Sequence, residues 1–303
     1  MLTIFSVPKP FVGHIGVIQR NALQSWSHLY PPCEIVLCGD ELGIEEAARE
    51  FRTKWIPTLT RNDFGTPLLN SVFHQVREEA SQRLLCYVNA DIILLSDFLK
   101  AVRCIRFRKF LMAGQRWDMN IKGACDFNNP DWEGHLRAHL AKDGRLHPPA
   151  GSDYFVFPKD SDIGRFPPFA VGRPAWDNWL IYRARQLRIP VIDATKVVTV
   201  VHQNHDYAHM RKESDRRWKG SEADRNRELA GGWECVFTLL DATHLMTSKG
   251  VRPAFGYLYL KRRWQTLPIL VRGIRPILRR IKGMGNRLGF RNHLTKEKAG
   301  IRQ

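Results

Sequence analysis

The sequence contains no run of 18 apolar residues, so nothing in it predicts a helix that spans a membrane. Residues 1–7 enter a strand-like pattern at once, without the basic flank and small-residue cleavage site of a secretory signal. Cysteine is sparse, with six residues in 303, and none of them forms a CxxC pair or a zinc-finger spacing. We therefore expect no disulfide framework and a reducing, cytoplasmic location.

Acidic residues are few beside basic ones, with 30 Asp and Glu against 47 Lys and Arg. The imbalance is concentrated in residues 261–303, which hold 13 basic residues and one Glu and leave a net charge of +5 for residues 1–260. Hydrophobic residues at 44% and charged residues at 25% are ordinary for a globular protein and exclude wholesale disorder. The length fits one α/β domain with an appendage.

Strand-like apolar runs alternate with helical patterns in the first half of the chain. Alternation of this kind predicts a doubly wound, mostly parallel α/β sheet. The second half is less regular, with a polar stretch at 118–152 that reads as long loops around one helix. Strands are expected at 2–7, 34–38, 53–58, 84–88, 110–114, 154–157, 191–192 and 197–201, and helices at 16–29, 44–51, from 66 onward, near 132–140 and at 176–187.

The C-terminal part changes character from about residue 258 onward. Apolar side chains such as Trp264 and Leu267 recur at three- and four-residue steps, and arginines fill the opposite side. This pattern predicts a basic amphipathic helix, kinked at Pro268 and Pro276. We expect one domain over residues 1–245 and a helical extension over 246–303. The extension would dock peripherally on an anionic membrane face, or else pack its apolar stripe on the domain.

An apolar strand delivers Asn89 and Asp91 to its C-terminal end. Ligands of open α/β sheets lie in the crevice outside those ends. A carboxylate there suits a hard divalent cation that bridges phosphate oxygens. The alternative is an Asp that merely caps the next turn.

Three more polar residues are expected at the same edge of the sheet. Asp40 also follows a strand and could accept hydrogen bonds from a nucleobase or ribose. Arg61 and Asn62 precede a probable helix start at Thr66, where a helix N-terminus would favour phosphate. A solvated surface charge is the alternative for Arg61.

Two later segments offer further catalytic groups. Asp177 stands between Trp176 and Trp179 at a probable helix start, where it is either a general base or a first-turn acid that the helix dipole stabilises. His202 follows a strand and could reach a metal held by Asp91. The spacing of His202, His205 and His209 also invites a zinc site, but no Cys partner and no HExxH motif accompany it.

In this order the motifs resemble the nucleotide-sugar glycosyltransferases of the GT-A fold, nearest to family 2. The resemblance implies that Asp40 contacts the base and that Asn89-Ala90-Asp91 stands for the metal-binding DxD motif. It also makes Asp177 the catalytic base and His202 a late metal ligand. The sequence departs from the family pattern at Asn89, where the first Asp is expected, and at Trp176, where a Glu is expected.

The implied activity is hexosyltransferase-like transfer from a nucleotide-diphosphate sugar to an acceptor hydroxyl, inverting and assisted by Mn²⁺ or Mg²⁺. The acceptor would be a glycan, a lipid-linked molecule or a small molecule. Arg116 would contact the diphosphate or the sugar, and Asp153 would bind sugar hydroxyls unless it is only a turn residue at a strand start. Trp117 would stack on a sugar ring unless it packs in the core. With Trp176 and Trp179, these residues would form the sugar and acceptor subsite.

Three other functions are weighed against this one. A non-catalytic nucleotide- or sugar-binding protein could keep the fold, and Asn89 gives that alternative weight. A nucleotidyltransferase would favour a Gly-rich basic loop after the first strand, but residues 8–14 hold one Lys and no glycine cluster. Nucleic-acid binding would rest on the basic tail, which interleaves arginine with Ile and Leu rather than with stacking aromatics.

Overall fold

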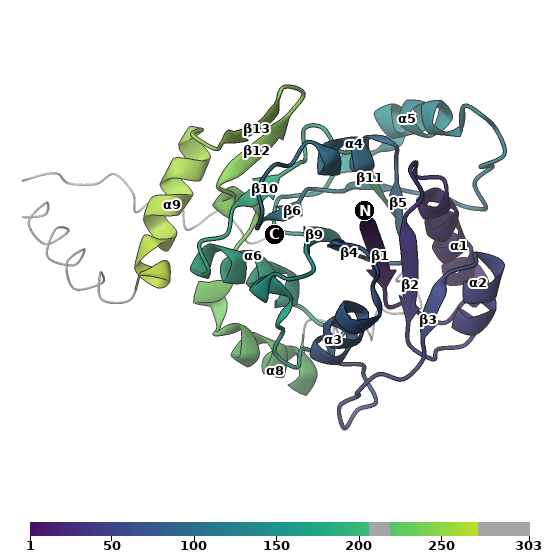
Figure 1. The fold of residues 1–303 in the computed structure, drawn as a ribbon, viewed down its shortest axis with the longest axis horizontal. Helices are drawn as coiled ribbons and strands as arrows, with labels where there is room; N and C mark the ends of the chain where they lie inside the picture. Colours follow the sequence, from purple (N-terminus) through teal and green to yellow (C-terminus); the bar gives the residue numbers. More distant parts are fainter. Residues whose placement is uncertain (206–218, 272–303) are drawn as a thin grey trace, which may run out of the picture.

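The computed structural model describes residues 1–205 and 219–271. A large sheet runs through the domain in the strand order β13-β12-β10-β6-β9-β4-β1-β2-β3 (Figure 1). All its pairs are parallel except those made by β9 and β13, which confirms the predicted mostly parallel α/β sheet. Its strands are β1 (Leu2–Ser6), β2 (Glu34–Cys38), β3 (Lys54–Ile56), β4 (Leu84–Val88), β6 (Leu111–Ala113), β9 (Tyr154–Pro158), β10 (Val191–Asp193), β12 (His244–Thr247) and β13 (Gly250–Pro253).

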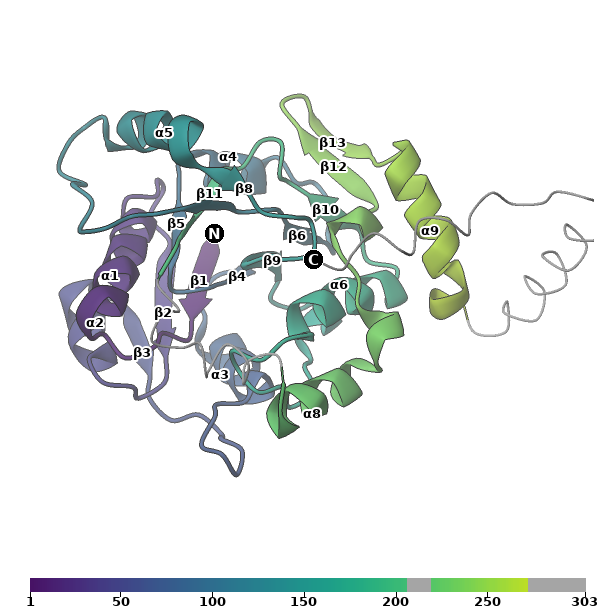
Figure 2. The same ribbon diagram turned by 180° about the vertical axis from the view of Figure 1, so that it is seen from behind.

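Helices cover both faces of this sheet, as Figures 1 and 2 show from opposite sides. Alternate strand residues point to opposite cores, so Phe5 packs with α3 and α6 while Leu2 and Ile4 pack with α1, α2 and α4. The chain is therefore doubly wound, as predicted. The helices are α1 (Gly13–Ser27), α2 (Ile44–Glu50), α3 (Leu69–Glu79), α4 (Asp97–Arg103), α5 (Trp132–Asp143), α6 (Trp176–Gln186), α8 (Ser221–Ala230) and α9 (Tyr257–Leu270).

A smaller sheet in the order β5-β11-β7-β8 lies beyond the carboxyl end of β4. It brings together segments far apart in the sequence, because β11 pairs antiparallel with β5 and parallel with β7. The sequence patterns did not predict this sheet. Its strands are β5 (Ile92–Leu94), β7 (Trp117–Met119), β8 (Arg145–Leu146) and β11 (Val200–Gln203).

Several predicted elements differ at their ends for local reasons. Helix α3 begins at Leu69 rather than at Thr66, because Pro67 and Leu68 are extended and bridge to Arg61 and Ala170. The predicted strand 197–201 moves to β11, since Val197 and Val198 turn back to the carbonyl of Ala194.

The segment 246–303 is described only as far as residue 271. Its first part forms β12 and β13, which join the large sheet, and α9 follows with Pro268 inside it. Arg262 attaches α9 to the domain through the buried carboxylate of Asp241, at 2.9 Å. Pro276 and the rest of the predicted amphipathic tail lie outside the described residues. In the described ranges, no helix combines the length and apolar character that a bilayer crossing requires.

Candidate metal and nucleotide site

The turn after β4 brings Asp91 beside a histidine from much later in the chain. The backbone N–H of Ile92 donates to the carbonyl of Asn89 at 3.1 Å, which closes the turn. Strand β5 follows at once and pairs with β11 in a register that sets His202 opposite Ile92. Because Asp91 precedes Ile92 directly, its carboxylate lies against the ring of His202.

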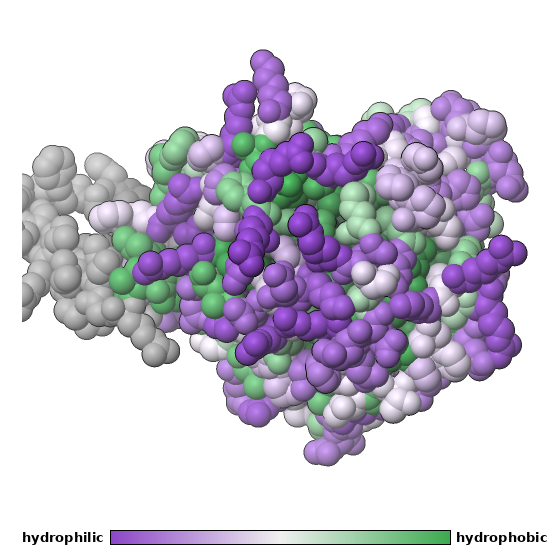
Figure 3. Space-filling model, viewed as in Figure 1, coloured by the Kyte–Doolittle hydropathy of each residue, from purple (hydrophilic) through white to green (hydrophobic). Residues whose placement is uncertain are grey.

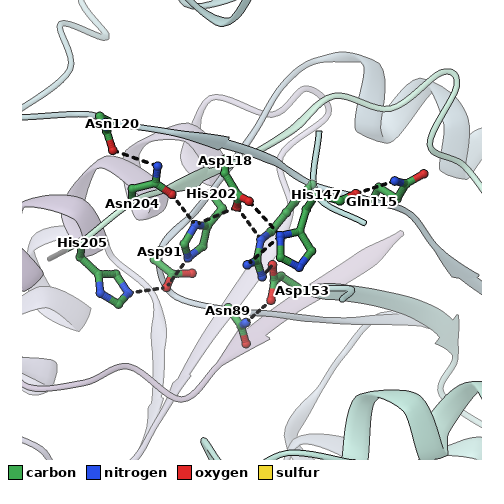
Figure 4. Close-up of polar contacts among 11 residues, drawn as sticks. Asn89, Asp91, Gln115, Asp118, Asn120, His147, Asp153, His202, Asn204 and His205 are labelled. Atoms are coloured by element: carbon green, nitrogen blue, oxygen red, sulfur yellow. Dashed lines mark hydrogen bonds and ion pairs between the residues drawn. The ribbon is translucent and has the colours of Figure 1, made fainter. Parts of the chain in front are cut away.

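Asp91, His202 and His205 form a cluster suited to a divalent cation (Figure 4). The Nε2 atoms of His202 and His205 lie 3.5 and 3.3 Å from Oδ2 of Asp91, and the three ligand atoms are within 4.8 Å of one another. The other carboxylate oxygen of Asp91 is buried and has no hydrogen-bond partner in the described structure. An unpartnered buried oxygen is costly, so it fits a ligand position.

The carboxylates and imidazoles of this cluster shift one another's pKa values. Burial alone would lower the pKa of His202, but the carboxylates of Asp91 and Asp118 raise it to about 10. Burial likewise opposes ionisation of Asp91, yet the two histidines hold the pKa of that carboxyl well below its usual range. Without a metal, the imidazolium of His202 is therefore the cation that Asp91 binds. A divalent metal would replace that proton.

Asp118 orients His202 from the opposite side of the ring. Strand β7 pairs with β11 in a register that places Asp118 beside His202, and its Oδ1 lies 3.3 Å from Nδ1 of the imidazole. Its second oxygen lies 2.8 Å from Nδ1 of His147. A carboxylate on one ring nitrogen of a histidine fixes the tautomer that leaves the other free for metal.

Arg116 connects Asp118, which contacts His202, with Asp153, which lies just before β9 of the large sheet. Its guanidinium donates to Asp118 at 2.8 Å and pairs with Asp153. Asp153 precedes β9, which runs antiparallel beside β4, and it also accepts from the side-chain amide of Asn89 at 2.7 Å. Gly114, two residues before Arg116, has no room for a side chain, because a Cβ there would overlap the hydroxyl of Tyr154. The structure thus places Asn89, Asp91, Arg116 and Asp153 together.

Asp177 lies in the first turn of helix α6, which packs on the face of the large sheet opposite to α1, α2 and α4. The helix begins after Ala175, whose φ of 86° is unusual for a residue with a side chain. The ring of Trp176 packs edge-on against Tyr87, 4.9 Å away, at the end of β4. Burial raises the pKa of the Tyr87 hydroxyl, and the charges of Asp91, Asp153 and Asp177 raise it further. The charges of these three carboxylates therefore act on one hydroxyl at the end of β4.

The three predicted sugar-contacting tryptophans lie in packed surroundings. Trp176 and Trp179 are each 7% exposed and belong to the core on the α3 and α6 face of the sheet. Trp179 packs against Phe169 with ring centroids 5.3 Å apart. Trp117 is half-buried and packs on the small core under α5. Contact of these rings with a sugar remains a prediction.

The predicted nucleotide residues Asp40 and Arg61 pair after the end of β2, and Asn62 has a different partner. Arg61 pairs with Asp40 and with Glu41. Burial alone would lower the pKa of Arg61, but these two carboxylates raise it above its usual value. The amide of Asn62 donates to Glu222 at 2.7 Å. The structure brings Asp40 and Arg61 together, and it links Asn62 to α8 instead.

Four residues of these clusters were not assigned to the site from the sequence. His205 belongs only to the spacing of His202, His205 and His209, which is weak support for a zinc site. His209 lies outside the described residues. Asp118 and His147 carry no motif, although Asp118 lies only two residues after Arg116, in β7. Glu222 pairs with Arg173 at 2.6 Å beside the start of α6. Nothing in the sequence singled it out.

The similarities of this chain to known proteins concern the fold alone. No protein-family model and no curated protein matches the sequence. Among solved structures, glucosyl-3-phosphoglycerate synthase from Mycobacterium tuberculosis, with Mg²⁺ and UDP, is 10% identical at a TM-score of 0.46 over 77% of this chain and 80% of that one. The mannosyltransferase PcManGT from Pyrobaculum calidifontis, with GDP-Man and Mn²⁺, is 12% identical at 0.42 over 76% and 68%. TarS 1-349 from S. aureus, with UDP-GlcNAc, is 15% identical at 0.40 over 76% and 70%.

These structures belong to the class of enzyme that the sequence motifs resemble. With TM-scores below 0.5, they leave the function of this chain to be argued from its own residues.

Proposed function

We propose that the protein transfers a glycosyl group from a nucleotide-diphosphate sugar to an acceptor hydroxyl with the help of a divalent cation. The observation that carries this proposal is the cluster of Asp91, His202 and His205 at the carboxyl end of β4. A buried carboxylate oxygen without a partner stands in it, and a guanidinium lies close by. This combination suits the oxygens of a diphosphate.

The cation would be held by Asp91, His202 and His205, and Mn²⁺ suits this mixed oxygen and imidazole set better than Mg²⁺ does. When bound, the cation would neutralise the negative charge that develops on the departing diphosphate. Arg116 adds a fixed positive charge from the protein. Its pairs with Asp118 and Asp153 hold the guanidinium in place.

The rest of the donor would lie along the ends of β2 and β4. Asp40 would accept hydrogen bonds from the base or ribose once Arg61 turns from it toward phosphate. Asn62 closes the same loop, because its side-chain oxygen accepts from the N–H of Thr66 at 2.9 Å. Asn89 and Asp153 are paired to each other and would offer polar groups to the sugar.

Asp177 would act as the general base. The acceptor oxygen would form a bond to the anomeric carbon while the bond from that carbon to the diphosphate oxygen breaks, and the hydroxyl proton would pass to Asp177. One displacement inverts the anomeric configuration. Trp176 and Trp179 would hold the start of α6 so that Asp177 faces the acceptor.

The proposal is tested by titrating the purified protein with UDP, and then GDP, with and without Mn²⁺. We expect nucleotide binding that depends on Mn²⁺ and that Asp91→Ala abolishes. Asp224→Asn, an exposed carboxylate on α8, is the matched control and should bind normally. Asp177→Asn should bind the nucleotide and lose transfer. Absence of nucleotide binding in the wild type would contradict the proposal.

The alternative is a non-catalytic protein that binds a nucleotide or sugar on the same fold. Asn89 in place of an acidic ligand favours it. It predicts that Asp177→Asn leaves the biological activity intact, whereas glycosyl transfer predicts its loss.

The C-terminal part suggests peripheral attachment at the inner face of a membrane. Helix α9 exposes apolar side chains to solvent, visible as green atoms at the left margin of the described surface in Figure 3. Tyr257, Leu258 and Trp264 are 74%, 59% and 61% exposed. The strongly basic sequence from 261 onward would add attraction to anionic lipid. Replacing Leu258 and Trp264 with Ser should reduce sedimentation with anionic vesicles, and unchanged sedimentation would contradict attachment through α9.

A further inference from the structure

A cavity of about 500 Å³ lies at the edge of the large sheet opposite the metal cluster. It is lined by residues just before β10 and at the start of β12, including Pro190 and His244. The metal cluster, by contrast, follows the carboxyl end of β4. We call this space the arginine cavity, because Arg185, Arg188 and Arg263 line it.

No carboxylate is among the residues that line the arginine cavity. Arg263 donates to the backbone carbonyls of Ala242 and Thr243, at 3.4 and 2.9 Å, and Arg185 donates to the carbonyl of Asp241 at 3.2 Å. Backbone carbonyls fix these guanidinium groups without neutralising them. The Nε atom of Arg263 is buried and has no hydrogen-bond partner in the described structure.

The carboxylate of Asp241, whose backbone carbonyl accepts from Arg185, is already engaged by other partners. Asp241 accepts from Nε of Arg262 at 2.9 Å and from the N–H of Thr238 at 2.9 Å. Burial and the charge of Arg263 lower the pKa of Arg185, while the charge of Asp241 raises it, and burial and Arg263 also lower the pKa of His244. Arg185 and Arg263 therefore repel each other, and an anion in the cavity would relieve that repulsion.

The surroundings add positive charge rather than negative. The ring of Phe107 packs edge-on against His244, 4.9 Å away, and so brings the loop before β6 to the cavity. Arg106 and Arg108 flank Phe107 in that loop and are exposed. The exposed ring of Phe255 completes the rim.

We propose that the arginine cavity binds a phosphate-bearing anion, distinct from any donor at the metal cluster. Guanidinium groups present paired N–H donors that match phosphate oxygens. The volume exceeds that of a single phosphate and suits a small phosphate ester or a phospholipid headgroup. This site does not depend on glycosyl transfer, since it shares no residue with the metal cluster.

The test is calorimetric titration of the full chain with inorganic pyrophosphate, with a chelator present to exclude divalent metal. We expect one saturable site. Arg188→Glu should weaken binding about 10- to 100-fold, the range for losing a charge-assisted hydrogen bond. Arg188 is exposed, so this variant should fold. Arg263→Gln should weaken binding similarly, with its fold checked by circular dichroism.

Two controls separate this site from others. Arg225→Glu reverses an exposed charge on α8 and should leave pyrophosphate binding unchanged. Asp91→Ala alters the metal cluster and should also leave it unchanged. The proposal is overturned if the wild type shows no saturable binding, or if Arg188→Glu binds as the wild type does.

Vesicle binding then identifies the source of the phosphate. If it is a lipid headgroup, vesicles of phosphatidylcholine with phosphatidic acid should bind the wild type more tightly than Arg188→Glu, and phosphatidylcholine alone should retain neither. If it is a soluble ester, both proteins should bind the acidic vesicles equally while only the wild type binds pyrophosphate.

Discussion

Replacing Asp118 with Asn keeps the size of the side chain and removes the charge that orients His202. In the wild type, one carboxylate oxygen lies 3.3 Å from Nδ1 of His202 and 2.8 Å from Nε of Arg116. An amide carries no charge and has one acceptor oxygen, so it cannot serve His202 and Arg116 with one oxygen and His147 with the other, as the carboxylate does. Loss of a partner behind a metal ligand typically weakens metal binding about 10- to 100-fold, or about 1.4 to 2.7 kcal/mol.

The neighbouring side chain of Asn204 decides where in that range the loss falls. Its carbonyl oxygen lies 3.3 Å from the same Nδ1 of His202 and offers a second acceptor. We therefore expect Asp118→Asn alone to lie near the tenfold end. Combining it with Asn204→Ala should bring the loss closer to 100-fold.

The assay is titration with Mn²⁺ in the absence of nucleotide, by calorimetry or by the electron paramagnetic resonance signal of free Mn²⁺. Asp224→Asn is the matched control, since that carboxylate also pairs with an arginine but lies on the exposed face of α8. If folded Asp118→Asn bound Mn²⁺ as tightly as the wild type, then Asp118 would not orient the ligand.

Three further predictions concern stability. The indole N–H of buried Trp26 donates to a backbone carbonyl of β5 at 2.8 Å, so Trp26→Phe should cost about 1–3 kcal/mol in urea unfolding. Arg262→Ala should cost about 2–4 kcal/mol in the same assay, because it strands the carboxylate of Asp241, which is 1% exposed. Burial opposes ionisation of Glu34, but hydrogen bonds lower its pKa from 4.5 to about 2. Its stabilisation is therefore complete above pH 4.5 and fades as the pH falls toward 2, and Glu34→Gln should flatten that part of the pH profile of unfolding.

The parts of the fold that could be predicted are those in which pattern and packing agree. The runs at β1, β2 and β4 are mostly apolar and, apart from Glu34 at the start of β2, lie buried between two helical layers, so the prediction of central strands is confirmed. The run at Tyr154–Pro158 was also recognised as a strand. Its antiparallel direction could not be read, because a strand buried on both faces has the same pattern in either direction.

The site followed the same division. Asp91 could be expected at a strand end because it follows the apolar run of β4. His202 was expected just after a strand, but it lies within β11 and meets Asp91 because β11 pairs with β5. His205 and Asp118 could not be assigned, since their roles depend on the register of the short strands β7 and β11. Two- to four-residue strands carry too little periodicity to fix a register from sequence.

The insertion of β9 between β4 and β6, and of β11 between β5 and β7, has a consequence for how the protein is made. Both inserted strands come later in the chain than the strands that they separate. A nascent chain must therefore wait for residues beyond 200 before Asp91 can meet its histidines. Pairings of such long sequence separation form slowly. Metal binding could thus assist only those folding steps that follow the synthesis of β11, and not the earlier ones.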